Sequence, residues 1–171
     1  MSVRLVIDPL DFVHNAGSHH GRIPLVELAR LHDLLFDTEG ELIYQISGRF
    51  DKDKKPGLYL EIKGRLHLSC QRCLGKLAHD IDLQTFLLLA KNEVELNQAD
   101  EDDTVDAILA TPDLNVISLI EDEVILSLPI SLHHADDECS TLKLKSSEDN
   151  LTGKTQPAHP FAALAALKKT N

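Results

Sequence analysis

Hydrophobic and polar residues alternate along three stretches in the middle of the chain, 41–50, 58–70 and 76–91. A period of two places apolar side chains on one face of a β-strand and polar side chains on the other. The apolar positions are Leu42, Tyr44, Ile46 and Phe50, then Leu58, Leu60, Ile62, Leu66, Leu68 and Cys70, and finally Leu77, Ile81 and Leu83. The connections are short and contain Gly, so they suit hairpin turns, and Gly75 is expected at a positive φ. The pattern predicts an antiparallel β-meander with one wet face.

Leucines recur at helical spacing after Pro24, a residue that suits the first turn of a helix. The apolar stripe would consist of Leu25, Leu28, Leu31 and Leu35. Residues 24–35 are therefore predicted to form an amphipathic helix. Residues 3–8 are predicted to form a short strand that Pro9 closes, and residues 14–21 a loop.

A second helical stripe precedes Pro129. It consists of Ile117, Ile120, Val124 and Leu128. Ser118 and Glu121 have the spacing of a capping box, which satisfies backbone N–H groups at a helix start. Pro129 cannot continue a helix, so a short helix ending there is predicted.

These elements predict an α+β fold in which a β-meander, forming a partly barrel-like sheet, carries two or three short helices. Residues 1–139 are expected to form one domain, and the acidic segment 93–106 a mobile loop within it. Residues 140–157 are polar and are predicted to be a flexible linker. Residues 158–171 are predicted to form a short C-terminal helix or tail.

A length of 171 residues suits a single core, and no apolar run approaches the ~18 residues that would span a bilayer. The N-terminus lacks a basic start followed by an apolar stretch. A cytoplasmic protein without a membrane partner is therefore expected. The three cysteines are an odd number, which suits a reducing compartment with free or metal-bound thiols.

The net charge of −11 argues against a nucleic-acid partner, but the charge is unevenly distributed. Residues 1–91 hold twelve basic and twelve acidic side chains, so the whole excess lies in residues 92–171. Within residues 42–91, basic side chains outnumber acidic ones nine to five. The sequence therefore predicts a cationic lobe on the paired strands, held apart from an anionic flank.

Cys70 and Cys73 lie at the second predicted hairpin, in a C-x-x-C arrangement. A redox pair would need a helix N-terminus to lower the thiol pKa, whereas a strand follows here. Cys139, with His134 or His133, could complete a tetrahedral zinc site. Two interpretations stay open: a structural zinc site of Cys70, Cys73, His134 and Cys139, or turn cysteines without a metal.

Motifs for a phosphate loop, a serine nucleophile elbow and a zinc protease are all missing, so no enzyme is predicted. The basic side chains of the meander are candidates for phosphate contact. They are Arg49, Lys52, Lys54, Lys55, Lys63, Arg65, Arg72 and Lys76. Tyr59 is the aromatic on the wet face that could stack on a base. A solvated sheet face would have the same composition. If the strands pair as predicted, Arg72 and Lys76 are expected near the run from Lys52 to Lys55.

Four segments, in order, resemble the bacterial YceD-like family, the large ribosomal RNA subunit accumulation proteins. They read "LVIDPL", "SCQRCLGKL", "IEDEVILSLPISLHHADDEC" and "HPFAALAALKK". The matching positions are Cys70, Arg72, Cys73, Glu121, Asp122, Glu123, Pro129, Cys139, Pro160 and Phe161. The chain departs from the family pattern in having a single cysteine, Cys139, before the final segment, and His159 where Asn is common.

The resemblance implies a non-enzymatic, cytoplasmic ribosome biogenesis factor, needed for 23S ribosomal RNA to be made, processed or maintained. The implied partner is 23S ribosomal RNA or its precursor, with a large-subunit ribosomal protein as a second candidate. An alternative from a different class is an acidic protein that chaperones a basic ribosomal protein through residues 95–106 and 136–138, without touching RNA.

Overall fold

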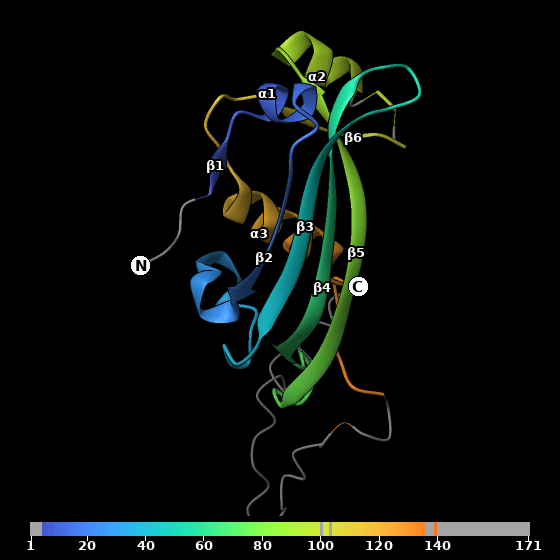
Figure 1. The fold of residues 1–171 in the computed structure, drawn as a ribbon. Coiled ribbons are helices and arrows are strands. Elements are labelled where there is room, and N and C mark those ends of the chain that lie inside the picture. The colour runs from blue at the N-terminus through green and yellow to red at the C-terminus, as the bar shows by residue number, and fades with distance from the viewer. Residues whose placement is uncertain (1–4, 100, 103, 136–138, 140–171) are drawn as a thin grey trace, which may run out of the picture. The chain divides into compact units, whose positions relative to one another are not determined.

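The computed structural model describes residues 5–99, 101–102, 104–135 and 139, all within one compact unit, residues 1–141 (Figure 1). In chain order the elements are β1 (Val6–Ile7), α1 (Pro9–His14), β2 (Ser18–Pro24), the 3₁₀ helices η1 (Leu25–Glu27) and η2 (Ala29–Leu31), β3 (Glu41–Phe50), β4 (Pro56–Ser69), β5 (Lys76–Ala90), α2 (Glu93–Ala99), β6 (Asp106–Leu109), β7 (Leu114–Asn115) and α3 (Val116–Ser127). The α+β prediction is confirmed. The predicted linker 140–157 and helix 158–171 lie outside the described residues.

The main sheet has the strand order β2-β3-β4-β5-β6. Strands β2, β3, β4 and β5 follow one another in the sheet, and each pairs antiparallel with the next, which confirms the predicted meander. Strand β6 runs parallel to β5. The sheet is not closed, so the predicted partly barrel-like sheet does not form a complete barrel. The short strand β6 pairs only with the last four residues of β5, and β2 forms the opposite edge. A two-stranded sheet of β1 and β7 lies apart from it.

The core lies on one face of the main sheet, against α3 and the 3₁₀ helices (Figure 1). The alternating apolar residues supply it as predicted, because the inward positions of β3 and β4 are fully or almost fully buried. Phe50 is an exception. It is 51% exposed at the end of β3, so its predicted inward position is wrong. Among the described helices, none is long and apolar enough to cross a membrane.

The N-terminal region differs from its prediction because Pro9 begins a helix rather than closing a strand. The Asp8 carboxylate accepts the backbone N–H groups of Leu10 and Asp11 at 3.0 and 3.2 Å, which caps α1. Pro at the first helical position needs no N–H partner. Residues 18–24, predicted largely as a loop, form β2 along β3.

The predicted helix 24–35 is wrong: Pro24 ends β2, and η1 and η2 follow. Leu25, Leu28 and Leu31 lie three residues apart, and a period of three matches a 3₁₀ helix better than an α-helix. The predicted burial of these leucines is confirmed, because all three are fully buried.

Helix α3 is confirmed but begins earlier than predicted. Asn115 caps it, since its Oδ1 accepts the N–H groups of Ile117 and Ser118 at 3.0 and 3.4 Å. The predicted capping box is therefore wrong. Glu121 is instead buried and accepts the backbone N–H of Arg30 at 3.0 Å, which ties α3 to η2.

The acidic segment after β5 contains a helix, so the expected loop is wrong for residues 93–99. Asn92 Oδ1 accepts the Glu95 N–H, and the Glu95 carboxylate accepts the Lys91 N–H, both at 2.9 Å. These local bonds start α2 although it buries no residue.

Candidate metal centre

The hairpin between β4 and β5 is a tight turn that carries Cys70 and Cys73. Cys70 N–H donates to the Gly75 carbonyl at 2.9 Å, and Leu74 N–H donates to the Cys70 carbonyl at 2.8 Å. Leu74, rather than Gly75, adopts the positive φ of 58°, which corrects the sequence expectation. Gly75 provides space, because a Cβ there would lie 3.4 Å from the Cys73 sulfur. The turn therefore curls around its two sulfur atoms.

The chain that follows α3 returns to this hairpin. Gln71 N–H donates to the Leu132 carbonyl at 2.8 Å, and Gln71 Nε2 donates to the Ile130 carbonyl at 3.3 Å. These bonds bring His134 beside the hairpin, although nearly sixty residues separate the two segments in sequence. Cys139 lies buried next to them.

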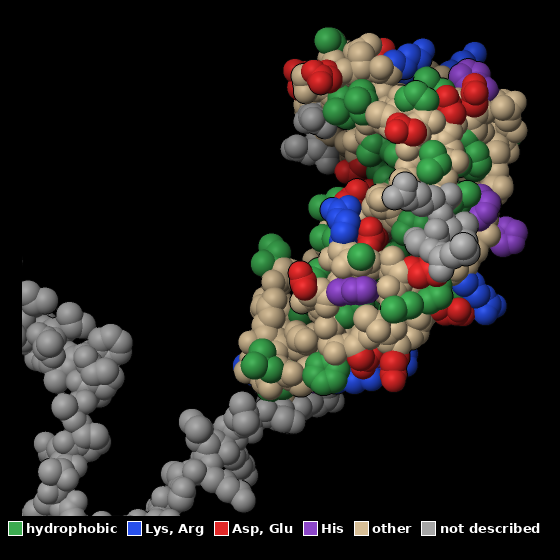
Figure 2. Space-filling view, turned by 90° about the vertical axis from the view of Figure 1, so that its left-hand side faces the viewer, with side chains coloured by type: hydrophobic (Ala, Val, Ile, Leu, Met, Phe, Trp, Pro, Cys, Tyr) green, Lys and Arg blue, Asp and Glu red, His purple; other side chains and the backbone are tan. Residues whose placement is uncertain are grey.

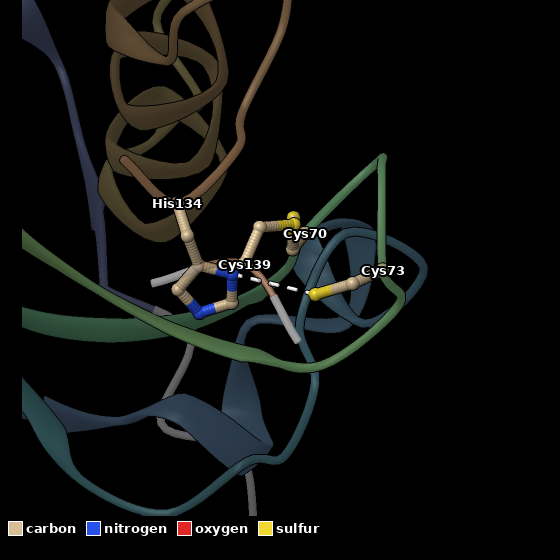
Figure 3. Close-up of side chains that lie close together, drawn as sticks. All are labelled: Cys70, Cys73, His134 and Cys139. Carbon is tan, nitrogen blue, oxygen red and sulfur yellow. Dashed lines mark hydrogen bonds between the residues drawn. The ribbon is translucent and has the colours of Figure 1, made fainter. Parts of the chain in front are cut away.

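Four donor atoms converge here, and all lie within 4.8 Å of one another (Figure 3). The sulfur atoms of Cys70 and Cys139 are 3.8 Å apart, and Cys73 Sγ is 3.4 Å from His134 Nδ1. A tetrahedral zinc ion with bonds of ~2.3 Å to sulfur and ~2.1 Å to nitrogen would separate its ligands by about 3.6–3.8 Å. The donor set and its spacing therefore fit zinc. Between the two histidines that the sequence left open, the structure places His134 in the cluster.

His134 is held in the orientation that a metal ligand needs. Its Nε2 lies 2.9 Å from the Lys76 carbonyl, an acceptor only, so Nε2 carries the proton. This leaves the Nδ1 lone pair directed at the cysteines. A backbone carbonyl in this position is a common outer partner of a metal-bound histidine.

The environment of the sulfur atoms lowers the pKa of Cys70 and raises the pKa of Cys73. Burial disfavours the Cys70 thiolate, but the backbone N–H groups of Cys73, His134 and Arg72 outweigh it and lower the pKa of Cys70 to about 5. The Gly75 N–H favours the Cys73 thiolate, yet burial and the neighbouring thiols raise the pKa of Cys73. The Lys76 carbonyl, followed by the Cys70 and Cys139 sulfurs, raises the pKa of His134.

A carboxylate that the sequence analysis missed, Asp37, supports the same end of the sheet. Its Oδ2 lies 2.7 Å from Lys76 Nζ, and its Oδ1 lies 2.9 Å from His67 Nδ1. The Lys76 hydrogen bond, opposed by burial and aided by His67, lowers the pKa of Asp37 to about 2. No periodicity or motif marks Asp37, because its partners lie on strands that follow it.

The structure separates the basic residues that the sequence grouped. Lys63 pairs with Asp82 at 3.3 Å, and Arg65 makes two bonds with Asp80 at 2.6 and 3.2 Å. Arg49 lies over the Tyr59 ring, with 4.1 Å from its guanidinium carbon to the ring centroid. The ring of Tyr59 is therefore covered on one face. Arg72 lies in the β4–β5 hairpin, between Cys70 and Cys73.

The expected proximity of Arg72 and Lys76 to the lysines of the first turn is wrong. Turns 51–55 and 70–75 lie at opposite ends of β4, whose 14 residues span about 45 Å. Among the described residues, Lys52, Lys54 and Lys55 have no ion pair.

The expected separation of positive and negative regions is also wrong. Lys54 and Lys55 line one cavity of about 510 Å³ together with Glu95 and Asp102. On the face shown in Figure 2, Lys and Arg side chains are scattered among acidic and apolar ones.

Residues 58–168 match the protein family model described as "Large ribosomal RNA subunit accumulation protein YceD". The matched range includes both parts of the metal centre, the β4–β5 hairpin and the segment after α3. No solved structure matches the chain.

Proposed function

The chain belongs to the YceD family of large ribosomal RNA subunit accumulation proteins, and we propose that it fills this role as a zinc-stabilised, non-enzymatic protein that binds 23S ribosomal RNA or its precursor. Family membership implies a role in the accumulation of large-subunit ribosomal RNA. The zinc, the direct RNA contact and the non-enzymatic action are the proposed parts.

The observation that carries the proposal is the complete set of four protein donors. Catalytic zinc sites keep one position open for water or substrate, whereas structural sites fill all four with protein ligands. Cys70, Cys73, His134 and Cys139 would fill a tetrahedral ion completely. A closed site would fasten the segment after α3 to the hairpin, and this favours a structural role for the metal.

The turn 51–55 is the part of the basic surface best suited to phosphate. Its lysines have no ion pair in the described structure, while Lys63, Arg65 and Lys76 are each paired with an aspartate. A paired cation must give up its partner before it binds a phosphate, so its net gain is smaller. We therefore propose that Lys52, Lys54 and Lys55 contribute more to RNA affinity than the paired residues do.

A gel-shift titration with a large-subunit ribosomal RNA fragment, at two salt concentrations, tests this proposal. The triple variant Lys52→Gln/Lys54→Gln/Lys55→Gln should weaken binding about tenfold or more and reduce the salt dependence, because each phosphate contact to single-stranded RNA contributes ~0.7 to the slope. The matched control Lys63→Gln/Arg65→Gln/Lys76→Gln removes three paired cations and should change affinity less than threefold.

Two results would contradict the RNA-binding part: no salt-dependent binding by the wild-type chain, or equal losses in the two variants. Depletion of the protein in cells should lower 23S relative to 16S ribosomal RNA. If depletion has this effect while the purified chain binds no RNA, the alternative of an acidic chaperone for a basic ribosomal protein gains support. A pull-down of such a protein that survives nuclease would identify it.

A further inference from the structure

Among the described residues, strand β5 has no partner strand on one edge along most of its length. It pairs with β4 over Gly57–Ser69, but β6 covers only Leu87–Ala90 on its other side. Figure 1 shows β5 at the rim of the sheet below β6. An exposed strand edge presents backbone donors and acceptors that can pair with another chain.

The pairing with β4 identifies the backbone groups that point outward. Cys70 N–H bonds to the Gly75 carbonyl, and the register continues without a bulge, so odd-numbered residues of β5 bond to β4. The backbone N–H and C=O groups of even-numbered residues therefore point away from β4. Two hydrogen bonds agree with this assignment: Lys76 and Ala90 use their carbonyls outward, toward His134 and Ala110.

The outward groups of four residues between these ends have no backbone partner among the described residues. These residues are Ala78, Asp80, Asp82 and Gln84. The stretch 78–84 is about 23 Å long, enough to align an extended peptide of seven residues. The stretch ends on one side where His134 bonds to the Lys76 carbonyl, and on the other side where β6 pairs with β5.

A groove of about 740 Å³ follows the upper part of this edge and is bounded by β5, β6 and α3. Its apolar lining includes Leu83, Leu119 and Leu126, the last of which is 78% exposed. A peptide strand laid against β5 would therefore have an apolar surface beside it.

The groove is acidic. Asp106, Asp122 and Glu123 line it, and no Lys or Arg does. Asp122 is paired with Arg30, but neither of the other two has an ion pair among the described residues. Burial, followed by Asp106 and Asp122, raises the pKa of Glu123, as expected where negative charge accumulates. On the opposite face of the edge, Asp80 and Asp82 are paired with Arg65 and Lys63, so the acidic character of this edge comes from the groove.

This charge selects among possible occupants. The cations beside this edge, Lys63 and Arg65, are already paired with Asp82 and Asp80, so a second copy placed along it would not offset the charge of Asp106 and Glu123. A segment with lysine or arginine would find complementary charge instead.

We propose that the 78–84 edge of β5, with the groove beside it, binds an extended protein segment of alternating apolar and basic residues by adding it as a strand to the sheet. Backbone hydrogen bonds supply the affinity, and the acidic groove selects for basic side chains. The inference goes beyond the proposed function and does not depend on the zinc or on RNA binding.

The test uses the full-length chain and a fluorescent decapeptide of alternating lysine and valine, with binding followed by anisotropy. We expect binding of this peptide and slower hydrogen exchange of the backbone amides in residues 78–84. The same peptide methylated on every backbone nitrogen keeps its charge but loses its donors, so its affinity should fall more than tenfold. A glutamate–valine peptide of equal length should not bind.

Variants of the chain test the role of the groove. Asp106→Asn/Glu123→Gln should lower the affinity about fivefold, because two partly exposed charge contacts are lost. Glu93→Gln/Glu101→Gln removes the same charge elsewhere and should leave the affinity within twofold. Three results would overturn the proposal: equal binding of the methylated peptide, equal effects of the two variants, or a stable dimer in sedimentation with residues 78–84 already protected.

Discussion

The two hairpin turns at the ends of β4 differ in what holds them and in what they can bind. Turn 51–55 is held by one of its own residues, because the Asp51 carboxylate accepts the N–H groups of Asp53 and Lys55 at 2.8 and 2.7 Å. Turn 70–75 has backbone bonds of its own but is also held from outside, by Gln71 bonds to the segment after α3 and by the contact of Cys73 with His134. The first is self-sufficient, while the second depends on distant parts of the chain.

The same contrast holds for charge. The lysines of the first turn have no ion pair in the described structure, whereas Lys76 beside the second turn is bound by Asp37. A count of charged residues along the sequence treats these lysines alike. Their capacity to bind a phosphate differs, because a distant carboxylate has already bound one of them. Residue pairing in space, rather than local composition, decides which cations are available.

The largest effect should come from breaking turn 70–75, for which we propose a zinc ligand set. Cys73→Ser removes one of four ligands, and we expect loss of bound zinc and a fall in thermal midpoint of about 10 °C, as for a loss of ~3 kcal/mol in a chain of this size. Elemental analysis and thermal unfolding measure both.

His133→Ala is the matched control for this variant. His133 is exposed, and its ring bonds to the His134 carbonyl instead of facing the cluster. Its replacement should leave metal content and thermal midpoint unchanged, while His134→Ala should behave like Cys73→Ser. The opposite pattern in the two histidine variants would refute the assignment of the ligand.

The stability of turn 51–55 should depend only on residues within the turn. Asp51→Ala removes the acceptor of two backbone N–H groups, and we expect a loss of about 1 kcal/mol in unfolding free energy, because the turn is exposed and water can replace the carboxylate. Chemical denaturation measures the loss. Zinc content should stay at the wild-type level, and a coupled loss of zinc would show that the two turns are not independent.

Asp37→Asn should reveal a pH-dependent contribution at the end of the sheet that carries turn 70–75. The pKa of Asp37 is lowered on folding to about 2 from an ordinary value of 3.8, so its ionised form favours the folded state. This stability is present above about pH 4 and is lost as the pH falls toward 2. The difference in thermal midpoint between wild type and variant should therefore be constant at neutral pH and shrink below pH 4. A difference that grows under acid conditions would contradict this assignment.

The smallest effects should come from relieving backbone strain, which both turns share. Lys54 and Leu74 have positive φ values of 61° and 58°. Glycine tolerates this conformation but costs entropy in the unfolded chain, so Lys54→Gly and Leu74→Gly should each stabilise the fold by no more than ~1 kcal/mol. Denaturant midpoints measure the gain, and a clear loss in either variant would mean that its side chain contributes contacts that outweigh the strain.

The strands could be predicted from the sequence because alternation is a local signal. The residues of β3 and β4 that face the core were identified almost completely, and the C-x-x-C turn was placed at the correct hairpin. The starts of α1 and α2 were missed, although Asp8 before Pro9 and Asn92 before Glu95 are recognisable helix caps. Proline also suits the end of a strand, and a run of acidic residues also suits a disordered segment, so the local pattern favours the wrong alternative in both places.

The metal cluster could be proposed from donor chemistry, but only the fold could choose between His133 and His134. The choice depends on Gln71 bonds across the chain and on the Lys76 carbonyl that orients the ring. The pairing of Lys63, Arg65 and Lys76 with aspartates could not be predicted from the sequence for a similar reason. Strand register sets the partner of each residue, and a register shift of one would place each of them opposite a different residue.

X-ray absorption at the zinc edge of the purified full-length chain tests the central claim most directly. The account predicts one zinc ion per chain, with three sulfur atoms at ~2.3 Å and one nitrogen at ~2.0–2.1 Å. A chain isolated without chelators that contains no zinc, or a zinc ion surrounded by oxygen and nitrogen atoms alone, would contradict it.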